Sequence, residues 1–154
     1  MAKPDDAYGL ALKALSYKER TESELRGWLA ERDVGEAELE EVIALLNEAG
    51  AIDDASFARR YAEDKRQLAG WGPSRISRAL EGRGVALGHI EAALGDENEE
   101  TQLARAIGLL GDRRMSCRDE RERERALGLL VRRGYPLELA YEAVRRAERL
   151  ADAA

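Results

Sequence analysis

The chain has 154 residues, of which 44% are hydrophobic and 36% charged, and its formal net charge is −6 at pH 7. This composition excludes a disordered acidic tail and is typical of a helical protein built as one ordinary domain or as a few small modules that share a core. The N-terminus lacks the apolar run of a signal peptide or membrane span, and the single cysteine cannot form an internal disulfide, so we expect a cytoplasmic protein with no membrane segment.

Apolar residues at helical spacing begin near the N-terminus. The first inward stripe is predicted to consist of Tyr8, Leu12 and Leu15. Thr21 and Glu24 then form a capping-box pattern, in which the threonine hydroxyl accepts from the backbone amide three residues on and the glutamate reaches back to the threonine amide. A second helix is predicted from this point, and a third lies within residues 35–50, where Gly50 ends it.

The middle of the chain repeats this plan. Asp53 or Asp54 is placed to cap a helix whose inward face is predicted to carry Phe57, Tyr61 and Leu68. Two shorter helices follow, within residues 73–84 and 86–95. At a shift of about 51 residues, Leu25, Leu29, Val34, Leu39 and Ile43 correspond to Ile76, Leu80, Val85, Ile90 and Leu94. At a further shift of about 50, the pattern continues with Ala126, Leu130, Tyr135, Ala140 and Val144.

The turn between the second and third helix also recurs, as Asp33-Val34, Gly84-Val85 and Gly134-Tyr135. Its first residue suits the positive φ that stops one helix and redirects the chain. No segment shows the sustained alternation of a half-buried strand. We therefore predict an all-α fold of three tandem three-helix repeats, over residues 1–52, 53–96 and 97–154, packed end to end into an elongated, curved body.

The sequence offers little catalytic chemistry. His89 is the one histidine, which excludes a two-histidine metal site, and we expect it at the surface. Arginines beside Cys117 could lower the pKa of its thiol, but a free thiol in a loop is the favoured interpretation. In the stretch Gly70-Trp71-Gly72-Pro73 the proline removes an amide donor, and no GK[ST] pattern exists, so this is not a phosphate loop. We predict no enzyme activity, no metal and no cofactor; function must come from binding.

The same stretch reads as the start of a helix. Shifted by about 51 residues, Gly72 falls on the N-cap Thr21. Pro73 is then the first helical residue, where its missing amide costs nothing. Trp71 and Ile76 occupy the two positions of a hydrophobic staple.

Positive charge is distributed unevenly. Residues 1–52 hold 12 acidic and 6 basic side chains, whereas the two groups balance in the rest of the chain. The run over residues 117–128 mixes both signs, which favours a solvated helix start over a binding face. Arg75 stands in a first turn, where the helix dipole disfavours a cation by roughly 0.3–1 kcal/mol and an anionic partner would offset that cost. The candidate contact residues are Arg59, Arg60, Lys65, Arg66, Arg75, Arg78, Arg132 and Arg133.

Residues 53–85 closely resemble the central signature of RecX regulatory proteins. The matching positions are Asp54, Phe57, Ala58, Tyr61, Gly70, Trp71, Gly72, Pro73, Arg75, Ile76, Leu80, Gly84 and Val85. The flanking stretches "ALKALSYKERTESELRGWL" and "ALGLLVRRGYPLELAYEAV" also resemble the family.

This resemblance implies tandem three-helix repeats that bind RecA and its filament on single-stranded DNA. It further implies inhibition of the ATPase and strand-exchange activities of RecA, and so regulation of recombinational DNA repair and the SOS response. Family members often carry a more basic face than this acidic chain, so we expect only weak direct DNA contact, and a monomer when free. The alternative is an autonomous helical DNA-binding module that uses the central basic residues.

Overall fold

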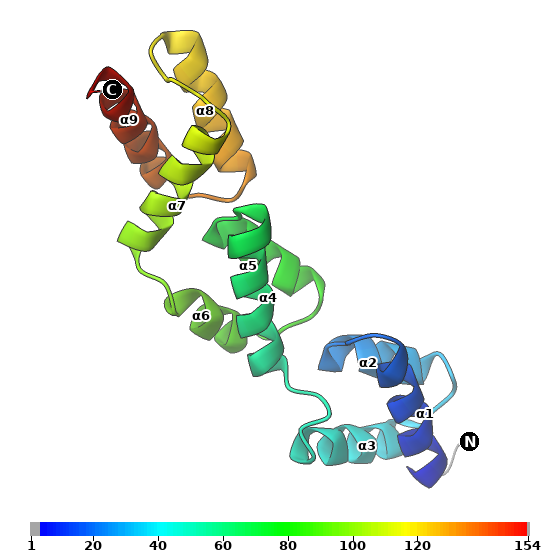
Figure 1. Cartoon of the computed structure of the whole chain (residues 1–154). Helices are drawn as coiled ribbons and strands as arrows, with labels where there is room; N and C mark the ends of the chain where they lie inside the picture. The colour runs from blue at the N-terminus through cyan, green and yellow to red at the C-terminus, as the bar shows by residue number, and fades with distance from the viewer. Residues whose placement is uncertain (1–3, 154) are drawn as a thin grey trace. The chain divides into compact units, whose positions relative to one another are not determined.

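The computed structural model describes residues 4–153, and this part of the chain folds into nine helices with no strand (Figure 1). In order they are α1 (Pro4–Tyr17), α2 (Glu22–Ala30), α3 (Glu36–Glu48), α4 (Asp54–Ala69), α5 (Pro73–Gly82), α6 (Leu87–Gly95), α7 (Glu99–Asp112), α8 (Glu120–Arg132) and α9 (Leu137–Ala153). The prediction of an all-α fold built from consecutive three-helix groups is confirmed. No described helix is both long enough and apolar enough to cross a bilayer.

Two predicted helix starts show how local chemistry sets these bounds. The capping box of α2 is present: the Glu24 amide donates to Thr21 Oγ1 at 3.2 Å, and the Thr21 amide donates to Glu24 Oε1 at 2.9 Å. Asp53 caps α4 by accepting from the Ser56 amide at 3.1 Å. Asp54 has a different task, because its Oδ1 accepts from the backbone amide of Glu22, at the first turn of α2, at 3.0 Å.

The turns predicted to need a positive φ have one. Asp33, Gly84 and Gly134 have φ angles of 60°, 78° and 97°. The repeated apolar positions are also buried, except for Leu94, which is half-buried. The register of about 50 residues that the sequence suggested therefore describes equivalent places in the fold.

Contacts between residues divide the chain into two compact units. The first extends to residue 58 and includes residues 80–90; the second comprises residues 59–79 and those from 91 onward. In the first unit the core lies among α1, α2 and α3, where Leu25, Leu29, Val42 and Leu46 are fully buried. In the second, α7 and α8 both pack on α9 around Leu110 and Leu130.

Two predicted inward faces are wrong in part. On α1 the buried residues are the alanines at 7, 11 and 14, whereas Leu12 is 43% exposed. Small side chains allow α1 to lie close to α2 and α3, so the alanine stripe is the one that packs. On α4, Phe57 is buried but Leu68 is 86% exposed, at the rim of a pocket described below.

Candidate functional site

The start of α2 packs against the turn that follows α5. We call this contact, between residues 21–24 and 83–84, the first junction. Thr21 Oγ1 donates to the Arg83 carbonyl oxygen at 2.6 Å, and the guanidinium of Arg83 donates from Nη2 and Nε to the Glu24 carboxylate at 2.8 and 3.2 Å. Gly84 has to be glycine here, because a Cβ would overlap the side chain of Ser23. A hydrogen bond from a side chain to the backbone and a forked ion pair therefore fix the first junction.

The electrostatics of Glu24 favour its charged form. Burial alone raises the pKa of the Glu24 carboxyl, but hydrogen bonds from Arg83 and Thr21 outweigh it and bring the pKa below its ordinary value. Arg83 also lies over the ring of Phe57, with its guanidinium carbon 4.6 Å from the ring centroid. The guanidinium of Arg83 therefore already has partners within the protein.

The start of α5 packs against the turn that follows α8. We call this contact, between residues 72–75 and 133–134, the second junction. The Gly72 amide donates to the Arg133 carbonyl oxygen at 2.7 Å, and the Ser74 amide donates to that of Gly134 at 2.9 Å. The prediction that Gly72 precedes a helix with Pro73 as its first residue is confirmed. A Cβ at Gly72 would lie 2.7 Å from the Gly134 carbonyl, so close backbone approach requires glycine.

The side chains of the second junction differ from those of the first. The place of Glu24 is taken by Arg75, and the place of Arg83 by Arg133. Arg133 Nη1 donates to the Ala69 carbonyl oxygen at 2.6 Å, and Arg75 Nη1 donates to that of Arg132, the last residue of α8, at 3.3 Å. A cation is favourable at a helix C-terminus. Arg75 therefore has a role in folding that the sequence did not reveal.

Two of the predicted contact residues meet on the ring of Trp71. Lys65 Nζ lies 4.7 Å from the ring centroid, and the guanidinium carbon of Arg75 lies 4.3 Å from it. The ring of Tyr61 approaches edge-on, with the two centroids 6.5 Å apart. Such cation–π contacts hold long basic side chains in place. Trp71 stands at the expected staple position and Ile76 is buried, while a direct contact between them stays a prediction.

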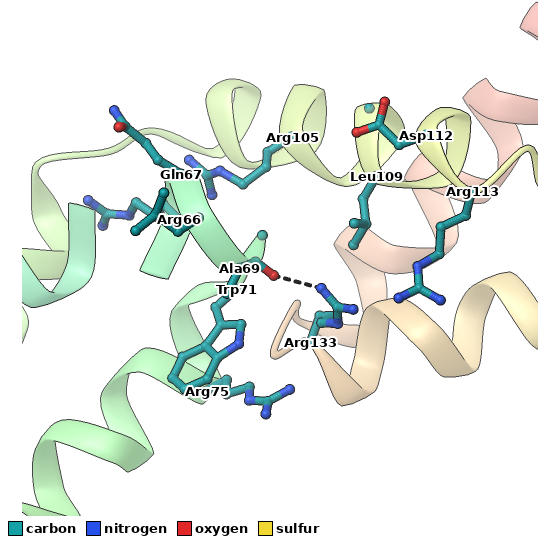
Figure 2. Close-up of a pocket in the computed structure, with 13 residues that line it drawn as sticks. Arg66, Gln67, Ala69, Trp71, Arg75, Arg105, Leu109, Asp112, Arg113 and Arg133 are labelled. Atoms are coloured by element: carbon teal, nitrogen blue, oxygen red, sulfur yellow. Dashed lines mark hydrogen bonds between the residues drawn. The ribbon is translucent and has the colours of Figure 1, made fainter. Parts of the chain in front are cut away.

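Beside the second junction lies a pocket of about 720 Å³ (Figure 2). Its walls come from the end of α4, the start of α5, the C-terminal half of α7 and the turn after α8. Five arginines line it: Arg66, Arg75, Arg105, Arg113 and Arg133. Arg105 and Arg113 are not among the predicted contact residues, because α7 belongs to a segment in which the charges balance and only the fold brings it to this pocket.

Arg66 differs from the other predicted contact residues because it is buried. Its side chain is only 7% exposed, its Nη2 donates to the Ala93 carbonyl oxygen at 3.2 Å, and its Nε lies 3.5 Å from Glu97 Oε1. Glu97 also pairs with Arg105. The charge of Arg66 is therefore neutralised inside the protein, and burial argues against the predicted contact of this residue with a partner.

The remaining predicted contact residues are at the surface. Arg59, Arg60, Arg78 and Arg132 are exposed, and none of them lines the pocket. The predicted basic set therefore falls into two residues of the second junction (Arg75 and Arg133), Lys65 beside it on Trp71, one buried member (Arg66) and these four exposed residues.

The two residues considered for reactivity have ordinary environments. His89 is exposed, as predicted. Cys117 lies in the loop between α7 and α8, as predicted, but its side chain is fully buried, and burial raises the pKa of the thiol above its usual range. The possibility of an arginine-activated thiol is therefore wrong. Over the described residues, no three side chains of His, Cys, Asp or Glu gather where they could hold a metal ion.

Comparison with known proteins gives one consistent family. Two family models match: the first three-helix domain of RecX over residues 7–46, and the second over residues 53–94. The "Regulatory protein RecX" of Mycobacterium sp. (strain JLS) is 30% identical over 149 residues, covering 92% of this chain and 81% of the relative. That of Streptomyces lividans is 31% identical over 147 residues, covering 93% and 78%. The predicted boundaries at residues 52 and 96 stay predictions.

Solved structures agree on the fold. The crystal structure of RecX from Lactobacillus salivarius superposes with a TM-score of 0.85 at 23% identity, covering 96% of this chain and 97% of that one. A second crystal structure, of a regulatory protein RecX, gives a TM-score of 0.77 at 28% identity and covers 93% of this chain and 71% of that one.

Proposed function

Because the chain belongs to the RecX family, we propose that it binds RecA and its filament on single-stranded DNA and inhibits the ATPase and strand-exchange activities of RecA. In this role it restrains recombinational DNA repair and the SOS response, in the cytoplasm, by binding and not by catalysis. The observation that carries the proposal is the extent of the similarity: it covers 92% of this chain and 81% of a relative named as a regulatory protein.

Basic residues of the second unit supply candidate contacts for this partner. Arg59, Arg75, Arg78 and Arg132 are exposed and lie on α4, α5 and the end of α8, while Lys65 on α4 and Arg133 in the turn after α8 are half-buried. Lys65 and Arg75 are held against Trp71, so ordering them on binding costs less side-chain entropy than ordering free side chains would. We expect them to contribute more than the basic residues that have no such support.

The test is the ATPase activity of RecA on single-stranded DNA in the presence of the full chain. Inhibition that grows with the concentration of the chain is the expected result. An unchanged rate of ATP hydrolysis at several-fold molar excess of the chain over RecA would refute the proposal. A double variant, Arg75→Glu with Arg78→Glu, should weaken inhibition while circular dichroism shows the helical content of the parent chain.

The alternative is an autonomous DNA-binding module. Burial of Arg66 removes one cation from the basic set on which it would depend. Its signature would be an affinity for naked DNA that falls steeply with salt, with a slope near −0.9 per phosphate contact on duplex DNA. We expect only weak binding of this kind, which a salt titration with labelled oligonucleotide measures directly.

A further inference from the structure

Both junctions join the start of a helix to a turn with a glycine at positive φ, but they differ in one charge. In the first, the cation at position 83 is matched by a carboxylate at position 24, which accepts two of its hydrogen bonds. In the second, Arg133 occupies the place of the cation, and Arg75 occupies the place of the carboxylate. The second junction therefore has the cation of the first and lacks its anion.

The space beside Arg133 is open and positively charged. Arg75, Arg113 and Arg133 all line the pocket of about 720 Å³, and none of them pairs with a carboxylate of the described residues. Figure 2 shows the Arg133 guanidinium between those of Arg75 and Arg113, while the carboxylate of Asp112, which also lines the pocket, points away from them. Three cations around one opening repel one another unless an anion enters.

We propose that this pocket binds a carboxylate from an acidic segment of a partner protein, held by Arg75, Arg113 and Arg133 in the way that Arg83 holds Glu24. Arginine suits the task because its planar fork of donors matches the two oxygens of a carboxylate. The protein groups that already fix Arg133 and Arg75, the carbonyls of Ala69 and Arg132, hold the guanidinium groups in place before the partner arrives.

Two observations favour a protein carboxylate over a nucleic-acid phosphate. The first junction supplies the precedent, since the anion at the equivalent position is a glutamate side chain. The pocket lining is also partly apolar, because Leu68, which is 86% exposed, and Leu109 belong to it. Apolar side chains next to the acidic residue of a peptide could pack on these leucines, whereas a sugar–phosphate chain offers no such side chains.

The chemistry of this carboxylate site does not depend on the proposed function. Only the identity of the partner, RecA, rests on that function. The test therefore uses the full chain alone first. An acetylated tetraglutamate amide is titrated into the isotope-labelled protein, and NMR follows the arginine Nε and tryptophan Nε1 signals. Tetraglutamine of the same length is the uncharged control, and an oligothymidylate represents nucleic acid.

The expected result is that tetraglutamate shifts the signals of Arg75, Arg113, Arg133 and Trp71, whereas tetraglutamine does not. Arg133→Gln should weaken the affinity roughly tenfold, the loss expected for a charge-assisted contact. Arg125→Gln is the matched control, because Arg125 is an exposed arginine on α8 that does not line the pocket. It should change the affinity by less than about twofold.

The most discriminating variant is Arg75→Glu. It places in the second junction the carboxylate that the first junction has, so Arg133 should be paired internally and tetraglutamate binding should be lost. The variant loses the exposed hydrogen bond from Arg75 to the Arg132 carbonyl oxygen but gains an ion pair and an acidic residue in the first turn of α5, so its thermal stability should stay close to that of the parent chain. Binding of tetraglutamate by Arg75→Glu as strong as by the parent would overturn the proposal. Stronger binding of oligothymidylate than of tetraglutamate at the same three arginines would also overturn it, in favour of a phosphate ligand.

A RecA assay separates this inference from the proposed function. If the chain binds tetraglutamate but leaves the RecA ATPase unchanged, the site stands and the proposed function fails. If the chain inhibits RecA and tetraglutamate shifts none of the three arginines, the proposed function stands and the site fails.

Discussion

Glu24 and Arg83 lie 59 residues apart in the sequence and are joined by two hydrogen bonds, from Arg83 Nη2 and Nε to the Glu24 carboxylate at 2.8 and 3.2 Å. The residues one repeat later, Arg75 and Arg133, again stand in a helix start and in the turn that packs on it, but they are not opposite in charge. Repeat proteins reuse a packing solution while single side chains change its chemistry. Here one junction is closed by an internal salt bridge, and the other leaves a cationic pocket.

The Glu24–Arg83 pair should make part of the stability depend on pH. The folded-state pKa of Glu24 lies below its ordinary value of 4.5, so its stabilisation is present above that pH and is lost as the pH falls through the folded pKa. Glu24→Gln keeps the capping geometry but removes the charge. Because both side chains are about one-third exposed, we expect a loss of about 0.5–1 kcal/mol at neutral pH.

Urea denaturation of the parent and of Glu24→Gln from pH 7 down to pH 3 measures this effect. The difference between the two should be constant at neutral pH and should shrink as the pH falls below the ordinary carboxyl pKa of 4.5. A difference that stays the same down to the lowest pH would mean that the lost stability comes from the shape of the side chain and not from its charge.

Much of the fold could be predicted from the repeat alone. The capping box at Thr21, the start of a helix at Pro73 and the positive φ at Gly134 all follow from local backbone chemistry that the sequence displays directly. The inward face of α1 could not be predicted in this way, because hydrophobicity ranks Leu12 above its alanine neighbours. Close helix packing prefers the small side chains, and that preference depends on what lies opposite.

The candidate site was predictable only in part. Arg75 and Arg133 stand out once the register is known, since the first copy holds Glu24 at one of these positions. Arg113 reaches the pocket only through the placement of α7. The burial of Arg66 depends on Glu97 and on a carbonyl 27 residues away, contacts that no local pattern indicates.

Gly134→Ala should be among the most damaging single changes in the second unit. Its φ of 97° is strained for alanine, and the new Cβ would overlap the backbone nitrogen and the Cβ of Arg75, which cannot move without shifting α5. We expect a loss of at least about 2 kcal/mol, measured by urea denaturation.

Gly111→Ala is the matched control for this change. Gly111 lies within α7, and a Cβ there would meet no atom within 4 Å. Alanine should therefore leave the stability unchanged or raise it by up to about 1 kcal/mol. Equal losses for the two variants would contradict a junction-specific role for Gly134.

Cys117 should react slowly with thiol reagents in the folded protein. Burial raises the pKa of its thiol, and the thiolate is the reactive form, so both access and ionisation are unfavourable. Ellman's reagent at pH 8 measures the rate. We expect slow labelling in native buffer and fast labelling in concentrated urea, with a native rate that follows the opening of the C-terminal core. Equal rates in the two solutions would show that the thiol is accessible.

Glu97 should be essential to the second unit, because it neutralises two arginines from a nearly buried position. Its side chain is 8% exposed and that of Arg66 is 7% exposed, so Glu97→Gln would leave a buried cation without its partner. We expect a loss of about 3 kcal/mol or more, since breaking a buried pair costs more than the pair itself contributes. Glu148→Gln, which breaks the exposed pair with Arg123, should cost at most about 1 kcal/mol. Urea denaturation compares the two variants. A loss for Glu97→Gln no larger than that for Glu148→Gln would contradict a buried Arg66–Glu97 pair, and Arg66 would then be available to a partner.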